Sequence, residues 1–201
     1  MTALDQSQAI AEGQLSAAEL MEATLSQIDR VNPQVNAIVS LRDADELMAE
    51  ARAMDETPRK GWLHGIPVAV KDLANAEGLP TSMGNPMFAN SIAPKDDLVV
   101  ARMRAAGAVV IGKTNTPEWG LGSHTFNPVH GATRNPYDLS RSAGGSSGGA
   151  AAALAARMLS VADGSDMMGS LRNPGAWNNV YGFRPTYGRV PSEPVGDNFL
   201  H

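Results

Sequence analysis

Apolar residues recur at helical spacing near the start of the chain. Residues 5–12 suit a short helix, and Ser16 begins a second one through the capping-box pattern that it forms with Glu19. The apolar face of this second helix consists of Leu20, Met21, Leu25, Ile28 and Val31. Because the residue before a proline disfavours helical backbone angles, the pattern predicts that the helix ends before Asn32-Pro33.

The helical scaffold continues to about residue 60. Residues 35–39 alternate between polar and apolar side chains as a short strand does, and residues 43–54 return to helical spacing. Residues 1–60 are therefore predicted to be mainly helical and to support the rest of the chain.

Two apolar runs follow; the first ends in a lysine and an aspartate, Lys71-Asp72, and the second ends in a lysine, Lys113. Residues 65–72 and 108–113 have the length and composition of buried strands. Between them, Asp96-Asp97 can cap a helix that runs to about Ala106 and ends at Gly107. The order helix, glycine, strand predicts an α/β fold in which helices cover a sheet.

Two long segments have the composition of loops. Residues 75–95 are rich in Gly, Pro, Ser and Asn, and residues 114–134 contain two histidines, His124 and His130. Their spacing of six residues matches neither a helical pair nor a zinc pattern, so we expect hydrogen-bonded loop histidines near a pocket and no metal.

Two turns of small residues carry serines. Residues 144–149 read GGSSGG, residues 164–170 read GSDMMGS, and an alanine-rich helix is predicted between them over residues 150–157. A glycine-rich turn before a helix can bind phosphate, but neither G-x-x-x-x-G-K-S/T nor G-x-G-x-x-G is present. Glycines in the first turn also let its backbone approach a ligand or strand closely.

The second turn suits a nucleophile. Ser170 would have the backbone N–H groups of Met167, Met168 and Gly169 beside it, and such groups can stabilise the oxyanion of a tetrahedral intermediate. No G-x-S-x-G motif is present, so a histidine base has no sequence support. Lys71 is the alternative base, because burial can lower the pKa of a lysine. A lysine at a strand end can also extend its amine to solvent, and position alone favours that interpretation.

Composition narrows the class of protein. The 201 residues are sufficient for one domain. The net charge of −5 carries no basic block, so neither nucleic acid nor an anionic membrane is indicated as a partner. Cysteine is absent, no apolar run is long enough to span a membrane, and the N-terminus lacks a signal pattern, so we expect a cytoplasmic protein that acts on a small molecule.

Three of these segments together resemble the amidase signature family. They are GIPVAVKD with Lys71, GGSSGG with Ser146, and DGSDMMGSLRNP with Ser170, in the order and at the spacing of that family. The resemblance runs from about residue 5 to the end of the chain. It implies a mixed β-sheet covered by helices, one domain over residues 1–201, and no cofactor.

The resemblance also implies roles for individual residues. Ser170 would be the nucleophile, Ser146 the bridging serine after a cis peptide bond, and neutral Lys71 the base. The backbone amides of Met167, Met168, Gly169 and Ser170 would form the oxyanion hole. Ser147, Ser165, Asp166 and Arg172 would support the site, although Asp166 and Arg172 can equally form a purely structural ion pair.

The sequence departs from the family in two respects. Met168 replaces a common glycine, so the methionines must either point away from the oxyanion or shape the pocket. The DMMGS pattern is similar to a subgroup of acylamidases and hydrolases of ω-amino-acid oligomers. Family members are usually more than twice as long, so we expect a fold that is incomplete on its C-terminal side, and residues 196–201 carry no recognisable end signal.

The implied function is hydrolysis of carboxylic amides, and of some esters, through a serine acyl-enzyme. Two alternatives stay open: an inactive fragment or binding module that keeps the motifs, and the glutamine-hydrolysing subunit of a tRNA-dependent amidotransferase. Because an incomplete sheet would expose apolar edges, we also expect a homo-oligomer.

Overall fold

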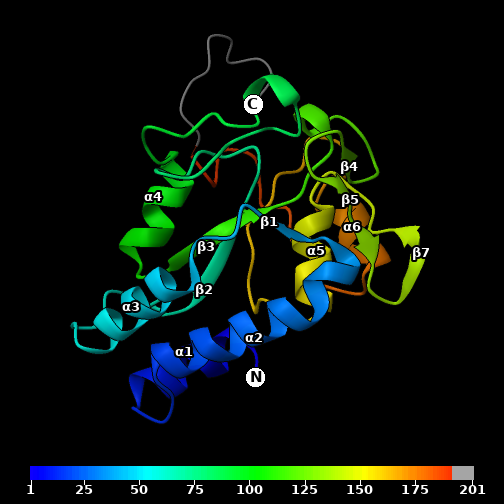
Figure 1. The fold of residues 1–201 in the computed structure, drawn as a ribbon. Coiled ribbons are helices and arrows are strands. Elements are labelled where there is room, and N and C mark those ends of the chain that lie inside the picture. The colour runs from blue at the N-terminus through cyan, green and yellow to red at the C-terminus, as the bar shows by residue number, and fades with distance from the viewer. Residues whose placement is uncertain (192–201) are drawn as a thin grey trace.

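The computed structural model describes residues 1–191 and consists of a small sheet with helices on both faces (Figure 1). The chain end over 196–201 lies outside the described residues. The helices are α1 (Ala3–Ala11), α2 (Ala17–Val35), α3 (Ala44–Asp55), α4 (Leu98–Ala105), α5 (Gly148–Ala155) and α6 (Arg172–Trp177), with short 3-10 turns η1 (Pro86–Phe88) and η2 (Glu118–Gly120).

The central sheet has the order β1 (Ile38–Val39), β3 (Val109–Thr114), β2 (Pro67–Lys71). β1 is antiparallel to β3, whereas β2 is parallel to it. This is the mixed sheet that the resemblance implied. Two short hairpins, formed by β4 (Phe126–Asn127) with β5 (Gly131–Ala132) and by β6 (Arg134–Asn135) with β7 (Asp138–Ser142), lie beside it (Figure 1).

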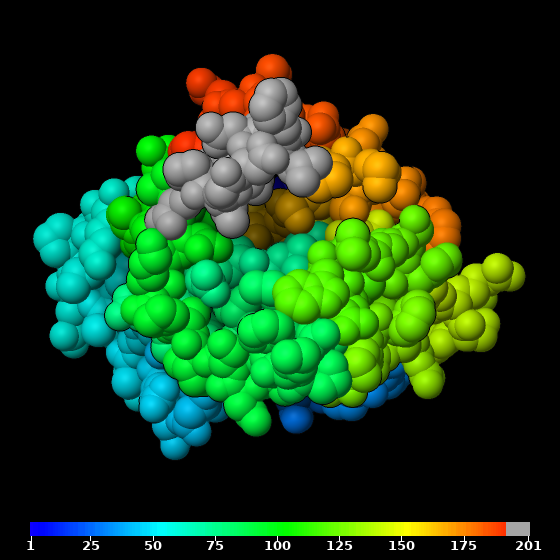
Figure 2. Space-filling model, turned by 90° about the horizontal axis from the view of Figure 1, so that it is seen from above, coloured from blue at the N-terminus to red at the C-terminus, as the bar shows by residue number. Residues whose placement is uncertain are grey.

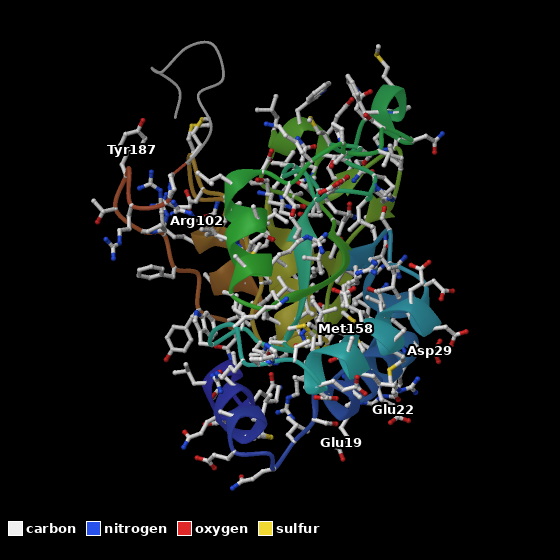
Figure 3. The ribbon with its side chains drawn as sticks, turned by 90° about the vertical axis from the view of Figure 1, so that its left-hand side faces the viewer. Glu19, Glu22, Asp29, Arg102, Met158 and Tyr187 are labelled. Atoms are coloured by element: carbon white, nitrogen blue, oxygen red, sulfur yellow. The ribbon has the colours of Figure 1, made fainter. Side chains whose placement is uncertain are left out.

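The two faces of the sheet are covered by different helices. On one face, Ala69 and Ile111 pack in a core with residues of α2, α3 and α5. On the other, Val70 and Val110 pack against Val100 of α4. Figure 3 shows how apolar and charged side chains are separated: Met158 lies inside, whereas Glu19, Glu22 and Asp29 point away from the body of the protein. The sheet is therefore buried on both faces, as its uninterrupted apolar strands predict.

The N-terminal helices confirm most of the sequence prediction. Ser16 caps α2 and forms the reciprocal capping box with Glu19. The predicted end of this helix before Asn32-Pro33 is wrong, because α2 continues through Pro33 to Val35. The Asn32 side chain accepts hydrogen bonds from the N–H groups of Ala37 and Ile38, and it thereby secures the backbone that follows the helix. As a result only residues 38–39 of the predicted strand are extended.

The helix α4 also begins differently from the prediction. Asp97 occupies the N-cap position, but its side chain makes no capping hydrogen bond. Its carboxylate instead accepts from the Asn75 N–H at 2.9 Å, and Asp96 accepts from the Glu77 N–H at 2.7 Å. The two aspartates therefore hold the loop that follows β2 against α4.

A bulge in the parallel pair determines which way the strand-end lysines point. Val68 pairs with Val110, but the next residue, Ala69, pairs with Gly112, so Ile111 is an extra residue in β3. After the bulge Val70 pairs with Lys113. Because paired residues point to the same face of a sheet and successive residues alternate, Lys113 lies on the α4 face and Lys71 on the opposite face.

No helix among residues 1–191 has the length and the apolar character that crossing a membrane would require.

Candidate active site

Lys71 ends β2 and is 1% exposed. Its amine does not reach solvent, which excludes the interpretation that it extends to the surface from a strand end. Its Nζ instead lies within hydrogen-bonding distance of three serine hydroxyls: Ser146 Oγ at 2.7 Å, Ser147 Oγ at 2.9 Å and Ser165 Oγ at 3.0 Å. The structure therefore brings Lys71 together with residues from both serine turns.

The surroundings of Lys71 favour loss of its proton. Burial lowers the pKa of the Lys71 amine from 10.5 to about 8, while the negative charges of Asp163 and Asp166 act in the opposite direction. Hydroxyl groups can accept hydrogen bonds from an ammonium and can donate to a neutral amine. The site can thus hold Lys71 in either protonation state, and the neutral state is accessible at mildly alkaline pH.

The first serine turn is packed tightly against Lys71. The Gly145–Ser146 peptide bond is cis, and Ser146 and Ser147 are both buried. A Cβ on Gly149 would lie 2.3 Å from the backbone nitrogen of Asn115, which follows β3, so only glycine permits this approach. The glycines of the motif therefore allow α5, which begins at Gly148, to bring the serines against the sheet.

The second serine turn is organised by Asp166. Its carboxylate accepts from the N–H groups of Gly169 at 2.6 Å and Leu171 at 3.1 Å, and from the Arg172 guanidinium at 2.9 and 3.0 Å. The paired Arg172 guanidinium, together with these amides, holds the pKa of Asp166 well below its usual range. The ion pair that the sequence left open is present, and it shapes the turn that carries Ser170.

Ser170 is partly buried and is joined to the first turn through the backbone. Its carbonyl oxygen accepts from the Ser147 N–H at 3.1 Å. Its hydroxyl has no hydrogen bond to another residue in the part of the chain that the structure describes. The two turns are thus adjacent through this backbone hydrogen bond.

The four expected oxyanion-hole amides differ in their partners. The Gly169 N–H is engaged by Asp166, whereas the Met167, Met168 and Ser170 N–H groups have no protein acceptor within residues 1–191. The side chains of Met167 and Met168 are largely exposed. They point into solvent, and the methionines therefore leave the backbone of the turn open.

Asp163 is a site residue that sequence reasoning missed. Its Oδ1 accepts the Lys71 N–H at 2.7 Å, and burial raises the pKa of its carboxyl group. A signal was available, because Asp163 closes the apolar segment 159–162 as Asp72 closes the run over 65–71. A charged residue at the end of an apolar run is also the feature that drew attention to Lys71.

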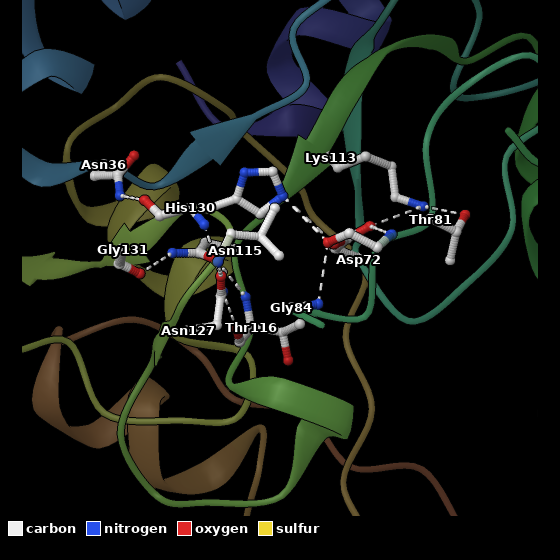
Figure 4. Close-up of polar contacts among 12 residues, drawn as sticks. Asn36, Asp72, Thr81, Gly84, Lys113, Asn115, Thr116, Asn127, His130 and Gly131 are labelled. Carbon is white, nitrogen blue, oxygen red and sulfur yellow. Dashed lines mark hydrogen bonds and ion pairs between the residues drawn. The ribbon is translucent and has the colours of Figure 1, made fainter. Parts of the chain in front are cut away.

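A second buried charge cluster lies on the α4 face of the sheet (Figure 4). Lys113 is fully buried, and its Nζ donates to Ala74 O and to Thr81 Oγ1 and lies 3.8 Å from Asp72 Oδ1. Asp72 also accepts from the N–H and hydroxyl of Ser82. Together with His130, whose Nε2 lies 3.2 Å from Ser82 Oγ, this cluster secures the loop after β2.

Among the described residues no group of three or more His, Cys, Asp or Glu side chains could hold a metal ion. His130 is the hydrogen-bonded loop histidine that the sequence predicts. His124 stacks near Trp177, with ring centroids 5.4 Å apart, and lines a shallow groove of about 500 Å³ beside the hairpins.

Viewed from above, the molecule is hollowed between the orange surface of its C-terminal segment and the green surface of the loops that follow β2 and β3 (Figure 2). The aromatic rings of Phe88 and Trp119 meet edge to face at 5.4 Å and join these two loops. The loops predicted to wall a site thus stand across from the segment that carries the second serine turn.

Comparison with known proteins agrees with this geometry. Residues 19–200 match the family model described as Amidase. The chain is 44% identical over 193 residues to a subunit of the glutamyl-tRNA(Gln) amidotransferase of Pseudomonas aeruginosa, covering 94% of this chain and 40% of that protein. It is 42% identical over 207 aligned positions to an acylamidase of Rhodococcus erythropolis, covering all of this chain and 43% of that enzyme.

Comparison of the fold with solved structures finds members of the same family. The structure of a bacterial aryl acylamidase of the amidase signature family superposes with a TM-score of 0.91 at 35% identity, covering 99% of this chain and 42% of that one. The chain therefore spans about two fifths of the length of the relatives it matches. On the family model, the sequence identity and the shared fold, the chain belongs to the amidase signature family.

Proposed function

We propose that the protein hydrolyses carboxylic amides through a serine acyl-enzyme. The observation that carries this proposal is the buried Lys71 amine, whose only polar neighbours at hydrogen-bonding distance among residues 1–191 are three serine hydroxyls. Burying a lysine without a salt bridge destabilises the fold. Burial also favours the neutral amine, and a catalytic base must be neutral, so a role as the base accounts for the buried position of Lys71.

In the first half of the proposed reaction, Ser170 Oγ attacks the amide carbonyl carbon. Its proton passes to Ser146 Oγ, while the Ser146 proton passes across the 2.7 Å contact to Lys71 Nζ. Open backbone amides of the second turn stabilise the oxyanion. The carbon–nitrogen bond then breaks, and the leaving amine takes the proton back through the same relay.

In the second half, water attacks the ester that joins the acyl group to Ser170. The relay again removes one proton and returns it to Ser170 Oγ when the carbon–oxygen bond breaks. The products are a carboxylic acid and an amine, and the lysine is neutral at the start and the end of each cycle. Ser147, Ser165 and the Asp166–Arg172 pair hold the groups in position.

The substrate class is proposed from the DMMGS pattern and from the acylamidase relatives. It comprises aryl or alkyl acylamides, ω-amino-acid oligomers and some esters. A panel of anilides, aliphatic amides and p-nitrophenyl esters, incubated with the purified chain, tests it by release of amine or phenol. A chain that leaves the whole panel intact, and that no fluorophosphonate labels, would contradict the proposed function.

A second candidate function is hydrolysis of glutamine within a tRNA-dependent amidotransferase. The 44% identity to one subunit of such an enzyme favours it. A glutaminase assay with and without the other subunits of that enzyme discriminates the two functions. Glutamine hydrolysis that appears only with partners would favour the amidotransferase role, and partner-independent cleavage of anilides would favour the amidase.

The activity is expected to rise with pH. Protonated Lys71 cannot accept a proton, and its pKa is lowered to about 8, so the reactive neutral fraction grows as the pH passes through that value. For an uncharged anilide, kcat/KM measured between pH 6 and 10 should increase tenfold per unit below the midpoint and level off above it. Activity that peaks below neutrality would show that Lys71 is not the base.

We also propose that the protein self-associates and that it resides in the cytoplasm. Large apolar side chains are exposed along the last described segment, and they are Trp177, Tyr181, Phe183, Tyr187 and Val190. Exposed patches of this kind mark interaction surfaces. Multi-angle light scattering at micromolar concentration should therefore give a mass above 21.1 kDa, whereas a monomeric mass would exclude the oligomer.

A further inference from the structure

We propose that Asp163 is a positioning residue of the active site, which holds the Lys71 end of β2 through its carboxylate and governs protonation of the Lys71 amine through its charge. This inference rests on the proposed role of Lys71 as the base. It adds a residue for which the motifs of the two serine turns provide no role.

The first observation is geometric. Asp163 Oδ1 accepts the backbone N–H of Lys71 at 2.7 Å, although the two residues are 92 positions apart in the chain. The bond joins the last residue of β2 to the segment that enters the second serine turn. A shift of Asp163 would therefore move the base and the nucleophile turn relative to each other.

The second observation concerns the charges around Lys71. Burial lowers the pKa of the Lys71 amine, and the negative charges of Asp163 and, more weakly, of Asp166 oppose that shift. Asp166 is already neutralised by Arg172 at 2.9 Å and by Arg184 at 3.6 Å. Asp163 has no such arginine among residues 1–191, so its charge is the one left to act on Lys71.

The third observation concerns Lys113, the other buried lysine. The positive charge of Lys113 also acts on the Asp163 carboxyl group, whereas Lys113 itself is paired with Asp72, beside which His130 lies at 3.7 Å. Lys113 thus has a carboxylate partner of its own in Asp72, whereas Asp163 is the carboxylate that is bonded to the Lys71 backbone.

The test is an NMR titration that does not depend on enzyme activity. The chain contains four lysines, so protein labelled with ¹³C at lysine Cε gives four signals, and Lys71→Met identifies the one that matters. In Asp163→Asn, which keeps an oxygen for the Lys71 N–H but removes the charge, the midpoint of the Lys71 signal should fall by about one pH unit. An unchanged midpoint in a folded Asp163→Asn protein would overturn the proposal.

Three controls make the result specific. Asp163→Glu keeps the charge and should keep the midpoint close to that of the wild type. Asp138→Asn removes an exposed carboxylate and should leave the Lys71 signal unchanged. Asp163→Ser provides a second uncharged variant, with the same expected fall, if the asparagine variant does not fold.

The wild-type protein supplies an independent measurement. Its Lys71 signal should show a second, smaller step where Asp163 ionises, as followed by the ¹³C signal of the Asp163 carboxyl group. An Asp163 transition that leaves the Lys71 signal unmoved would contradict the proposal. If the chain is active, the acid limb of kcat/KM should move in Asp163→Asn by the same amount as the NMR midpoint. If the chain is inactive but the midpoint moves, the role of Asp163 holds and the proposed hydrolysis fails.

Discussion

Replacement of Lys71 by methionine or alanine is expected to lower kcat/KM for amide hydrolysis by about 10²–10⁴-fold, the usual range for loss of a general base. Lys71 Nζ has Ser146 Oγ at 2.7 Å, and neither replacement offers an atom that accepts a proton. The methionine variant keeps most of the side-chain volume in the 1%-exposed site, so its loss of activity cannot be attributed to a cavity. Initial rates on an anilide at pH 9, with circular dichroism to confirm folding, measure the effect.

The control is another lysine of the same chain. Lys60 is exposed, and Lys60→Ala should keep the wild-type rate. A protein that binds amides without cleaving them would show no rate to lose, and its affinity for a substrate analogue would change little in Lys71→Met. A folded Lys71→Met enzyme with wild-type kcat/KM would show that another group is the base.

Replacement of Ser170 by alanine is expected to abolish covalent labelling and to lower kcat by at least about 10³-fold, since acyl transfer through this hydroxyl is then impossible. In the wild type, a fluorophosphonate should add a single label, and peptide mass spectrometry should find it on Ser170. The backbone of the turn is held by Asp166 rather than by the Ser170 hydroxyl, so the variant should fold with little loss of stability.

Other serines of the chain serve as the control and as the alternative nucleophiles in this experiment. Ser140 is exposed, and Ser140→Ala should keep both the label and the rate. Ser146 and Ser147 are buried against Lys71, and each is a chemically possible nucleophile. A label on Ser146 would exchange the proposed roles of the two turns, and a label that persists in Ser170→Ala would remove Ser170 from the mechanism.

The sequence correctly predicted those helices and strands whose determining residues lie close together in the chain. The capping box of Ser16 and Glu19 starts α2, and the apolar runs became β2 and β3. The prediction failed at Pro33, because α2 continues through the proline to Val35, and a proline in the last turn of a helix removes only the one hydrogen bond of its own missing N–H. The aspartates before α4 were likewise used by a distant loop and not by the helix.

The candidate site was predictable in its parts. Lys71, Ser146 and Ser170 were named from their motifs, whereas the burial of Lys71 was not predicted, because a lysine at a strand end can also extend its amine to solvent. The contacts among these parts were not predictable. Asp163 reaches Lys71 across 92 residues, and its place at the end of an apolar segment does not indicate which backbone N–H will donate to its carboxylate.

By itself, the sequence determined the family, the order of helices and strands, and the residue types available for chemistry, because motifs, capping residues and apolar periodicity are local properties of a chain. The family resemblance named Lys71, and only the tertiary structure shows why this lysine meets the serines while the equally buried Lys113 does not. The extra residue Ile111 in β3 puts Lys113 on the α4 face, while Lys71 points to α5 and the serine turns. A bulge depends on how two distant strands align, and the surroundings that lower the pKa of Lys71 exist only once the chain is folded.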